Sequence, residues 1–389
     1  MSKRTQRYTV EVGFPIACIG LTSKAEIVLG GGGGPGRSGV QNKLAVYAMD
    51  DKHRKLKRTG ELVLSSDEDS PTCLAMHPKE RVLACSVNAS KQAIKQGQNH
   101  NCRLFALKKS QITAGKRASS MCSTSDLDYQ KSIAFSSSGK LLAGGSTDGT
   151  LAVVRYPSLD RAFPFVDATQ EINDVDFGAA DKWLVAATDA ELRVVSTADA
   201  SLVQAIDDPH LRSGERAAFR FARFGRGTGN VLAGGSRVPA QQVLYTVLNS
   251  RGRAGGAYVV QWNTEGWQRI GTRFTGHSAI TTFALSPSGR LLAFATASLQ
   301  IGICDAHSLK VLMRVPAAHG FAITALAFDK DDRHLVSGSA DETCQVFVLP
   351  EQWPTPVDLV LEFGQQHLQA IAVLLVLLLA VILAVAMRS

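Results

Sequence analysis

A run of five glycines opens the stretch "GGGGGPGRSGVQNKLAVY", which extends from Gly30 to Tyr47. Its spacing is close to that of two phosphate-binding motifs. A P-loop pattern that starts at Gly31 has Arg37 where the motif has lysine, and the dinucleotide-binding pattern G-x-G-x-x-G is matched from Gly31 to Gly36. These matches raise the question of whether the stretch binds a nucleotide.

Both motifs need a helix that begins where the glycines end, because the phosphate binds free N–H groups at the helix N-terminus. Here Pro35, Gly36 and Gly39 continue the loop, and the following "NKLAVYAM" alternates apolar and polar residues as a strand does. We therefore predict that the glycines join two strands and bind no nucleotide. Ordering so many glycines is entropically costly, so the loop is either a flexible hairpin or is ordered by an ion or a partner.

Other patterns of catalytic residues are missing from the sequence. The seven cysteines include no C-x-x-C pair, the nine histidines include no H-E-x-x-H, and no Cys/His group has zinc spacing. A G-x-S-x-G nucleophile elbow is also absent. These absences argue against a catalytic metal and a hydrolase, and the odd number of thiols favours a reducing compartment.

The elements that position the glycine loop are predicted by an internal repeat. An apolar strand, a polar turn, a second strand that ends in small residues, another turn and a third strand recur along the chain. The clear copies are "IAFSSSGKLLAGGSTDGTLAVVRY" from Ile133, "FALSPSGRLLAFATASLQIGICDA" from Phe283 and "LAFDKDDRHLVSGSADETCQVFVL" from Leu326, and weaker copies begin at Leu74, Asp174 and Phe221.

The period of the repeat predicts the fold. Phe135, Phe177 and Phe224 lie 42 and 47 residues apart, and Leu285 and Phe328 lie 43 residues apart, which is the period of WD-repeat propeller blades. The Gly-His half of the WD signature occurs once in clear form, and the Trp-Asp half is absent. We predict an all-β, seven-bladed β-propeller of divergent WD repeats, with blades at about 14–49, 70–107, 130–156, 172–197, 216–263, 280–305 and 323–348.

Two further segments complete the predicted propeller. The longer gap between Phe224 and Leu285 is expected to hold an insertion, "PAQQVLYTVLNSRGRAGG". The alternating "RYTVEV", from Arg7 to Val12, precedes the first blade. We expect it to pair into the last blade, which closes the ring and hides the sheet edges.

The C-terminal part of the sequence predicts a membrane anchor. "LQAIAVLLVLLLAVILAVAM", from Leu368 to Met387, is uncharged, apolar and long enough to cross a bilayer. Residues 1–350 are the predicted cytosolic propeller, 351–367 a short connector, 368–387 the transmembrane helix and 388–389 a lumenal tail. The short span suits the thin membrane of the endoplasmic reticulum. We expect the protein to cross that membrane once, inserted by its C-terminal tail, so that the propeller faces the cytosol.

Basic residues cluster at Lys3–Arg7 and in "KHRKLKR", from Lys52 to Arg58, within a formal net charge of +8. No aromatic residues are interleaved to stack on bases, so we expect solvated loops and no nucleic-acid partner. These clusters could also contact an anionic membrane surface.

The glycine loop also carries a family resemblance. "GGGGPGRSGVQNKL", from Gly31 to Leu44, resembles the first-blade loop of the endoplasmic-reticulum guanine-nucleotide exchange factors that start COPII assembly, the WD-repeat family of prolactin regulatory element-binding protein. "DEDSPT", from Asp67 to Thr72, resembles the acidic-Ser-Pro entry to that family's second blade. The order of propeller and span is similar too. Only two residues follow the predicted span, which puts lumenal regulation in doubt.

The resemblance implies exchange on a Sar-type small GTPase, without covalent chemistry, through a loop that a potassium ion orders. Val40 is the expected apolar wedge, Asn42 orders the loop and meets the partner, and Lys43 pairs with an acidic group on it. The loop residues expected to contact the GTPase are Gly36, Arg37, Ser38, Gly39, Val40, Gln41, Asn42 and Lys43. Possible further contacts are Asp67, Glu68 and Asp69, whereas Pro71 is expected to be structural.

The potassium ligands expected from the resemblance are Gly32, Gly34 and Asn42. Backbone carbonyls of flexible glycines suit a large, weakly hydrated monovalent cation. A membrane-anchored scaffold without exchange activity stays open as the alternative, because WD-repeat propellers often serve only to bind other proteins.

Overall fold

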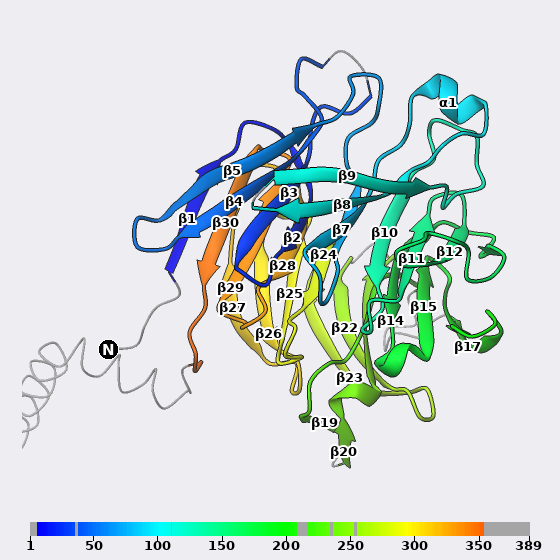
Figure 1. The fold of residues 1–389 in the computed structure, drawn as a ribbon. Coiled ribbons are helices and arrows are strands. Elements are labelled where there is room, and N and C mark those ends of the chain that lie inside the picture. Colours follow the sequence, from blue (N-terminus) through cyan, green and yellow to red (C-terminus); the bar gives the residue numbers. More distant parts are fainter. Residues whose placement is uncertain are drawn as a thin grey trace, which may run out of the picture.

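The computed structural model describes residues 6–35, 38–109, 111–207, 216–233, 236–252 and 255–353. They form seven four-stranded antiparallel sheets (Figure 1). The first strands of successive sheets contact one another in turn, and the seventh contacts the first again. The predicted all-β, seven-bladed propeller is confirmed.

Each blade consists of strands in chain order, except that the last blade takes its fourth strand from the N-terminus. Blade 1 is β2 (Ile16–Leu21), β3 (Glu26–Gly31), β4 (Lys43–Asp50) and β5 (Lys55–Val63). Blade 2 is β6 (Cys73–Met76), β7 (Val82–Ser86), β8 (Cys102–Lys108) and β9 (Gln111–Ala118), with α1 (Lys91–Lys95) between β7 and β8. Blade 3 is β10 (Gln130–Phe135), β11 (Leu141–Ser146), β12 (Thr150–Arg155) and β13 (Val166–Asp167).

The remaining blades follow the same plan. Blade 4 is β14 (Ile172–Phe177), β15 (Trp183–Thr188), β16 (Glu191–Ser196) and β17 (Leu202–Asp207). Blade 5 is β18 (Ala217–Phe224), β21 (Val243–Ser250), β22 (Ala257–Asn263) and β23 (Gln268–Gly276). Blade 6 is β24 (Ile280–Leu285), β25 (Leu291–Thr296), β26 (Ile301–Asp305) and β27 (Val311–Val315). Blade 7 is β28 (Ile323–Phe328), β29 (His334–Ser339), β30 (Thr343–Val348) and β1 (Gln6–Glu11).

The ring closes where β1 pairs with β30, as predicted. The two strands are antiparallel and in register from Gln6 opposite Val348 to Glu11 opposite Thr343. Tyr8 of β1 is buried in the core cluster shared by blades 7 and 1. Pairing both ends of the chain in one sheet leaves no open edge at the junction.

The small residues of the repeat lie where neighbouring blades meet. A Cβ atom on Gly145 of β11 would come within 2.4 Å of Ile172 in the next blade. On Gly338 of β29 it would come within 2.6 Å of Ile16. Glycine at these positions therefore lets the apolar side chains of adjacent blades pack closely.

The predicted blade bounds were too short. They include three strands of each blade and omit the outermost strand of blades 1 to 6. These outer strands are exposed, so they lack the apolar pattern on which the prediction relied. The basic segment from Lys52 to Arg58 is one example, because it is not a loop throughout: Lys55 begins the outer strand β5.

The prediction for blade 5 was wrong in its second strand. Val231–Ala233, expected in that strand, belong instead to a separate two-stranded hairpin, β19 (Asn230–Ala233) and β20 (Ser236–Pro239). Residues expected to form an insertion instead supply the blade strand β21. Short 3₁₀ turns occur at Ala179–Asp181 and Ala240–Gln242.

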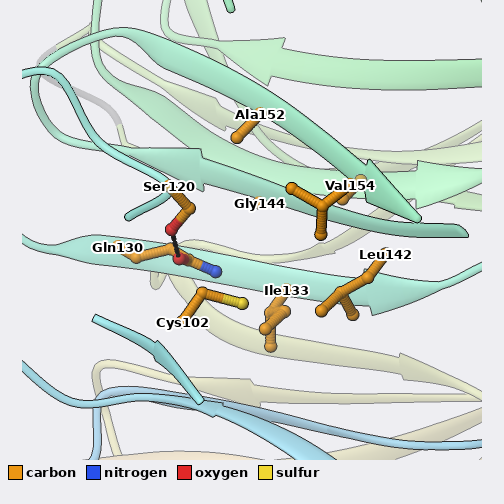
Figure 2. A pocket seen from close by; sticks show the side chains of 9 residues that line it. Cys102, Ser120, Gln130, Ile133, Leu142, Gly144, Ala152 and Val154 are labelled. Atoms are coloured by element: carbon orange, nitrogen blue, oxygen red, sulfur yellow. Dashed lines mark hydrogen bonds between the residues drawn. The ribbon is translucent and has the colours of Figure 1, made fainter. Parts of the chain in front are cut away.

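A small cavity lies between blades 2 and 3 (Figure 2). It measures about 10 Å³ and is lined mainly by apolar side chains, with Ser120 and Gln130 at its polar end. Ser120 donates a hydrogen bond to Gln130 there. This space fits about one water molecule and is far too small for a nucleotide.

The two ends of the strands define two faces. Gly32 N–H donates to Pro15 O at 3.0 Å, which places the β1–β2 connection beside the glycine loop on the "loop face". Gln6 and Val348 pair at the other ends of β1 and β30, on the "terminal face". In Figure 1 the loop between β3 and β4 reaches the top of the view and the β19–β20 hairpin lies at the bottom.

Within the residues described, no helix is long and apolar enough to cross a membrane. The predicted span at 368–387 lies outside them, as does the connector beyond Trp353.

Candidate functional site

The glycine loop connects two paired strands of blade 1. Strands β3 and β4 remain in register up to Gly31 opposite Lys43, so the loop begins directly at the last pair. A strand, not a helix, follows the glycines. The described residues of the loop therefore offer no helix N-terminus for a phosphate, and the prediction that the glycines join two strands is confirmed.

The start of the loop needs glycine because it lies against the β1–β2 connection. A Cβ atom on Gly31 would lie 2.0 Å from Pro15 O, so any side chain would displace that backbone. Gly32 has a φ of +145° and hydrogen-bonds to the same oxygen. Glycine adopts such conformations without steric cost.

Asn42, at the C-terminal end of the loop, holds the loop in place through hydrogen bonds. Its side chain is buried, accepts a hydrogen bond from Gly34 N–H at 3.0 Å and donates to Gly34 O at 2.9 Å. It also donates to Glu68 O at 2.9 Å, in the segment that leads to blade 2. One amide thus satisfies both backbone groups of Gly34 and ties the loop to the acidic segment.

Val40 is half-buried rather than fully projecting. It packs against the core cluster that includes Tyr8 and Tyr47, and its N–H group donates to Ser38 Oγ at 3.3 Å. The exposed part of the side chain is what a partner could contact, and its role as a wedge stays a prediction.

Lys43 already has a carboxylate within the chain. Its ammonium group lies 3.6 Å from Glu61 and 5.5 Å from the centre of the Phe14 ring. Only 15% of the side chain is exposed. The predicted pairing with a partner would require Lys43 to share or exchange this carboxylate.

The remaining residues of the loop that were predicted to contact the GTPase are exposed where the structure describes them. Gly39 and Gln41 are exposed, and Gly39 has a φ of +83° with open space around it. Gly36 and Arg37 lie outside the described residues.

The acidic residues before blade 2 do not act as one group. Asp67 is exposed, whereas Glu68 forms an ion pair of 2.8 Å with the largely buried Arg103. Asp69 is half-buried, and burial raises the pKa of its carboxyl above the usual value. Pro71 is buried against the position that a Cβ on Gly30 would occupy, which agrees with a structural role.

Hydrogen bonds of buried asparagine side chains connect the acidic segment to the next blade on the loop face. Asp69 N–H donates to Asn88 O at 3.0 Å, and the Asn88 side chain donates to Asp128 O at 2.8 Å. Asn99 supports Asn88 with a further hydrogen bond at 3.0 Å. Contacts therefore run without interruption from the glycine loop to the segment that enters blade 3.

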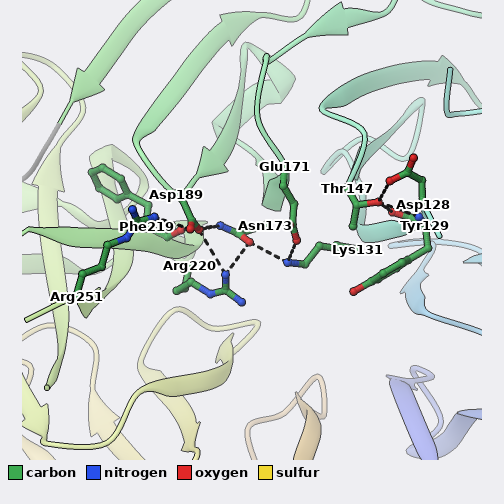
Figure 3. Close-up of polar contacts among 10 residues, drawn as sticks. All are labelled: Asp128, Tyr129, Lys131, Thr147, Glu171, Asn173, Asp189, Phe219, Arg220 and Arg251. Carbon is green, nitrogen blue, oxygen red and sulfur yellow. Dashed lines mark hydrogen bonds and ion pairs between the residues drawn. The ribbon is translucent and has the colours of Figure 1, made fainter. Parts of the chain in front are cut away.

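A charged network that the sequence did not predict lies further along the same face (Figure 3). The amide oxygen of Asn173 accepts from Lys131 and Arg220, each at 2.9 Å. Asp189 accepts from Asn173 at 2.8 Å and from Arg251 at 2.6 Å. A partner on this face would meet fixed charges on three successive blades.

A sequence signal for that network exists. Lys131, Asn173 and Arg220 each lie four residues before the phenylalanine that marks the repeat. They occupy equivalent positions on the first strands of blades 3 to 5, so aligning the copies would have brought them together.

The oxygen atoms around Gly34 match the donor type that a potassium ion prefers. Gly34 O and Asn42 Oδ1 are neutral oxygens, each with a second lone pair beyond the hydrogen bond described above. The Asp69 carboxylate lies near them, 3.8 Å from where a Cβ on Gly34 would be. No cluster of three His, Cys, Asp or Glu side chains able to hold a metal occurs in the described part of the chain.

Comparison with known proteins agrees with the propeller fold. The family model "WD domain, G-beta repeat" matches residues 124–154, 267–300 and 310–347. The chain is 28% identical over 331 residues to SEC12-like protein 2 of Arabidopsis thaliana, covering 82% of this chain and 75% of that protein. It is 25% identical over 348 residues to guanine nucleotide-exchange factor SEC12 of Candida glabrata, covering 88% and 72%.

An animal relative extends the similarity. Guanine nucleotide-exchange factor SEC12 of Mus musculus is 27% identical over 245 residues, which cover 60% of this chain and 57% of that protein. The chain resembles proteins named SEC12. The resemblance predicted from the glycine loop is therefore confirmed over most of the chain.

Proposed function

We propose that this chain is a guanine-nucleotide exchange factor for a Sar-type small GTPase and starts COPII vesicle budding at the endoplasmic reticulum. The names of its relatives support the exchange activity. The observation that carries the site is the Asn42 side chain, which holds an otherwise flexible glycine loop in one shape.

The proposed mechanism is differential binding. A loop held at Gly32 by Pro15 and at Gly34 by Asn42 loses little conformational freedom when it binds the switch region of the GTPase. If this surface fits the nucleotide-free shape of the switch better than the nucleotide-bound shape, it weakens the contacts to Mg²⁺ and phosphate. Val40 supplies the apolar contact, and no covalent bond is made or broken.

Gly32, Gly34 and Asn42 would hold the proposed potassium ion. When bound, this ion supplies positive charge that draws carbonyl oxygens together and so stiffens the loop. The two hydrogen bonds between Asn42 and Gly34 support this proposal, because they fix the orientation of the Gly34 peptide groups.

The proposed membrane anchor would raise the local concentration of the exchange loop. A GTPase that reaches the same bilayer meets a tethered propeller at a high effective concentration, which favours encounter without any new contact.

The experiment is release of a fluorescent guanine nucleotide from a Sar-type GTPase by the full chain in detergent, with potassium or sodium as the only monovalent cation. We expect fast release that depends on potassium and falls at least about tenfold in Val40→Asp. The matched control is Val63→Asp, an exposed valine at the end of β5 on the same face, which should retain activity.

The anchored scaffold predicts a different result. A chain that binds the GTPase but does not accelerate release with either cation would contradict exchange and leave only the scaffold. Replacement of Val40 and Asn42 by alanine separates the two functions further, because a scaffold that binds elsewhere would retain its partner.

A further inference from the structure

Both ends of the described propeller reach the terminal face. The pairing of Gln6 with Val348 places the start of β1 and the end of β30 side by side there. Only 14 residues separate Trp353 from the predicted span that begins at Leu368, and a chain of that length covers at most about 50 Å when fully extended. The terminal face would therefore lie within that distance of the bilayer.

Exposed basic side chains are concentrated on this face in blades 1 and 2. They come from the β2–β3, β4–β5, β6–β7 and β8–β9 turns and the adjoining strand ends. This "basic patch" consists of Lys24, Lys52, Arg54, Lys55, Lys57, Lys79, Lys108 and Lys109.

The turns of the two blades are joined into one surface. Arg81 forms an ion pair of 2.7 Å with Glu26 of blade 1 and donates to Leu107 O of blade 2 at 3.3 Å. The strands β5 and β9 also contact each other along the outside. The basic patch is therefore one continuous surface across blades 1 and 2.

The carboxylates of the same turns are occupied by partners within the protein. Asp50 accepts from His53 at 2.7 Å, and Asp51 accepts from Tyr8 at 3.0 Å and from His334 at 2.8 Å. Glu80 accepts from Tyr156 at 2.6 Å. Among the described residues, by contrast, no member of the basic patch forms an ion pair. These acids therefore have partners within the protein although Asp50 and Asp51 stay 46% and 42% exposed, whereas the bases of the patch have no ion-pair partner among the described residues.

We propose that the basic patch docks on the anionic phospholipid headgroups of the membrane that holds the predicted span. A negative lipid surface attracts such residues strongly, and the attraction acts within a Debye length. The short connector would allow the patch to come within that range. This inference rests on the predicted span and does not depend on the exchange activity.

Docking would orient the exchange loop. Strand β4 runs from the loop face at Lys43 to the basic patch at Asp50, so its eight residues separate the two by about 25 Å at about 3.3 Å per residue. The loop face would then point into the cytosol with the glycine loop raised above the headgroups.

The test uses the full chain in vesicles of phosphatidylcholine, with or without about 30% phosphatidylserine, and a fluorophore quenched by headgroup-labelled lipid. Native Cys122 is exposed between β9 and β10 and reports on the loop face. Ser23→Cys in a Cys122→Ser background reports on the terminal face. We expect Ser23→Cys to be quenched about twofold more in anionic vesicles, and the difference to vanish in about 1 M salt, while Cys122 stays unchanged.

Charge variants identify the surface. Joint replacement of Lys52, Lys55 and Lys57 by glutamine should abolish the lipid-dependent quenching. The matched control removes three exposed positive charges nearer the loop face through Lys95→Gln, Lys116→Gln and Arg117→Gln, and should retain it. Near-ultraviolet circular dichroism verifies that both variants are folded.

Three results would overturn the proposal. Quenching at Ser23→Cys could be independent of lipid charge, or the two triple variants could behave alike. The patch variant could also lose binding to single-stranded RNA while its vesicle quenching stays unchanged, which would identify a nucleic-acid surface. Nucleotide release is measured separately, so failure here leaves the proposed exchange function untouched.

Discussion

The side chain of Asn42 contributes the most to the shape of the candidate site. It makes three side-chain hydrogen bonds from a buried position, and its backbone carbonyl accepts from Leu64 N–H at 2.8 Å. Burial excludes water from these bonds, so each lost partner leaves an unsatisfied group. The proposed exchange activity would therefore depend on a residue that supports the loop from within, because Asn42 is too buried for the direct partner contact that the resemblance implied.

We expect Asn42→Ala to reduce the nucleotide-release rate at least about tenfold while lowering the free energy of unfolding by about 1–3 kcal/mol. The loop would lose its support without exposing the core. Stopped-flow release and denaturant unfolding measure the two effects. Asn230→Ala, which removes an exposed amide at the start of β19 away from the loop, is the control. Equal loss of rate in both variants would contradict this explanation.

A second residue-scale feature joins blades 7 and 1. His334 lies between the carboxylates of Asp329, at 2.7 Å, and Asp51, at 2.8 Å. Burial alone would lower the pKa of His334, but the hydrogen bonds to both carboxylates outweigh it and raise the pKa above its usual value. The charged imidazolium thus holds the two blades together.

The raised pKa fixes the sign of the pH dependence. Stabilisation by His334 is fully present below the unfolded pKa of about 6.5 and is lost as pH rises through the higher folded pKa. We expect His334→Gln to lower the free energy of unfolding by about 1–3 kcal/mol at about pH 6 and by less at about pH 9. Urea unfolding at both pH values tests this. A destabilisation that grows with pH would refute it, and exposed His53→Gln serves as the control.

At the scale of elements, β1 decides whether blade 7 is complete. Its Tyr8 packs into the core cluster between blades 7 and 1 and donates to Asp51 at 3.0 Å. We expect Tyr8→Ala to lower the free energy of unfolding by about 3–5 kcal/mol, because it leaves a cavity and removes one of the two hydrogen bonds that Asp51 accepts. Thr9→Ala, at the exposed neighbour in the same strand, should cost far less. Comparable losses in thermal unfolding would argue against ring closure through Tyr8.

Comparison with the sequence shows which elements local patterns can predict. The spacing of Phe135, Phe177 and Phe224 predicted the blades because these residues lie on inner strands, where Phe177 and Phe224 are buried and Phe135 is half-buried. Outer strands such as β5 pack on one side only, so their sequence reads as polar. In the blade 5 repeat, the sequence "VLAGGS" is nearly identical to "LLAGGS" of β11. The strand that pairs with β18 is nevertheless β21, Val243–Ser250.

The sequence predicted where the candidate site lies, but not the contacts that its side chains make. Glycine spacing and the following strand placed the loop within blade 1. The partners of Asn42 could not be predicted, because Glu68 lies 26 residues away in another connection. The pairing of Lys43 with Glu61 likewise depends on the register of β4 and β5.

At the scale of the whole molecule, the seven cysteines report on the packing of the propeller. Six are buried and Cys122 is exposed, and none forms a disulfide. Burial raises the pKa of the Cys102 and Cys344 thiols to about 12, which suppresses the reactive thiolate.

Titration with a thiol reagent should therefore give one fast equivalent in the native protein and seven after denaturation. Cys122→Ser should remove the fast phase and leave six equivalents in denaturant. Rapid reaction of several thiols in the native protein would show that the blades are more open than described.

The closure of the ring also has a mechanical consequence. Strand β30 leads to the C-terminal end of the described chain, yet it is flanked by β1 on one side and β29 on the other. A force along the axis of β30 would act on the hydrogen bonds to β1 and to β29 at the same time. The bonds of each strand pair would be loaded together in shear, rather than one after another. The N-terminal strand would thus resist the unfolding of blade 7 under any tension that the proposed anchor transmits to β30.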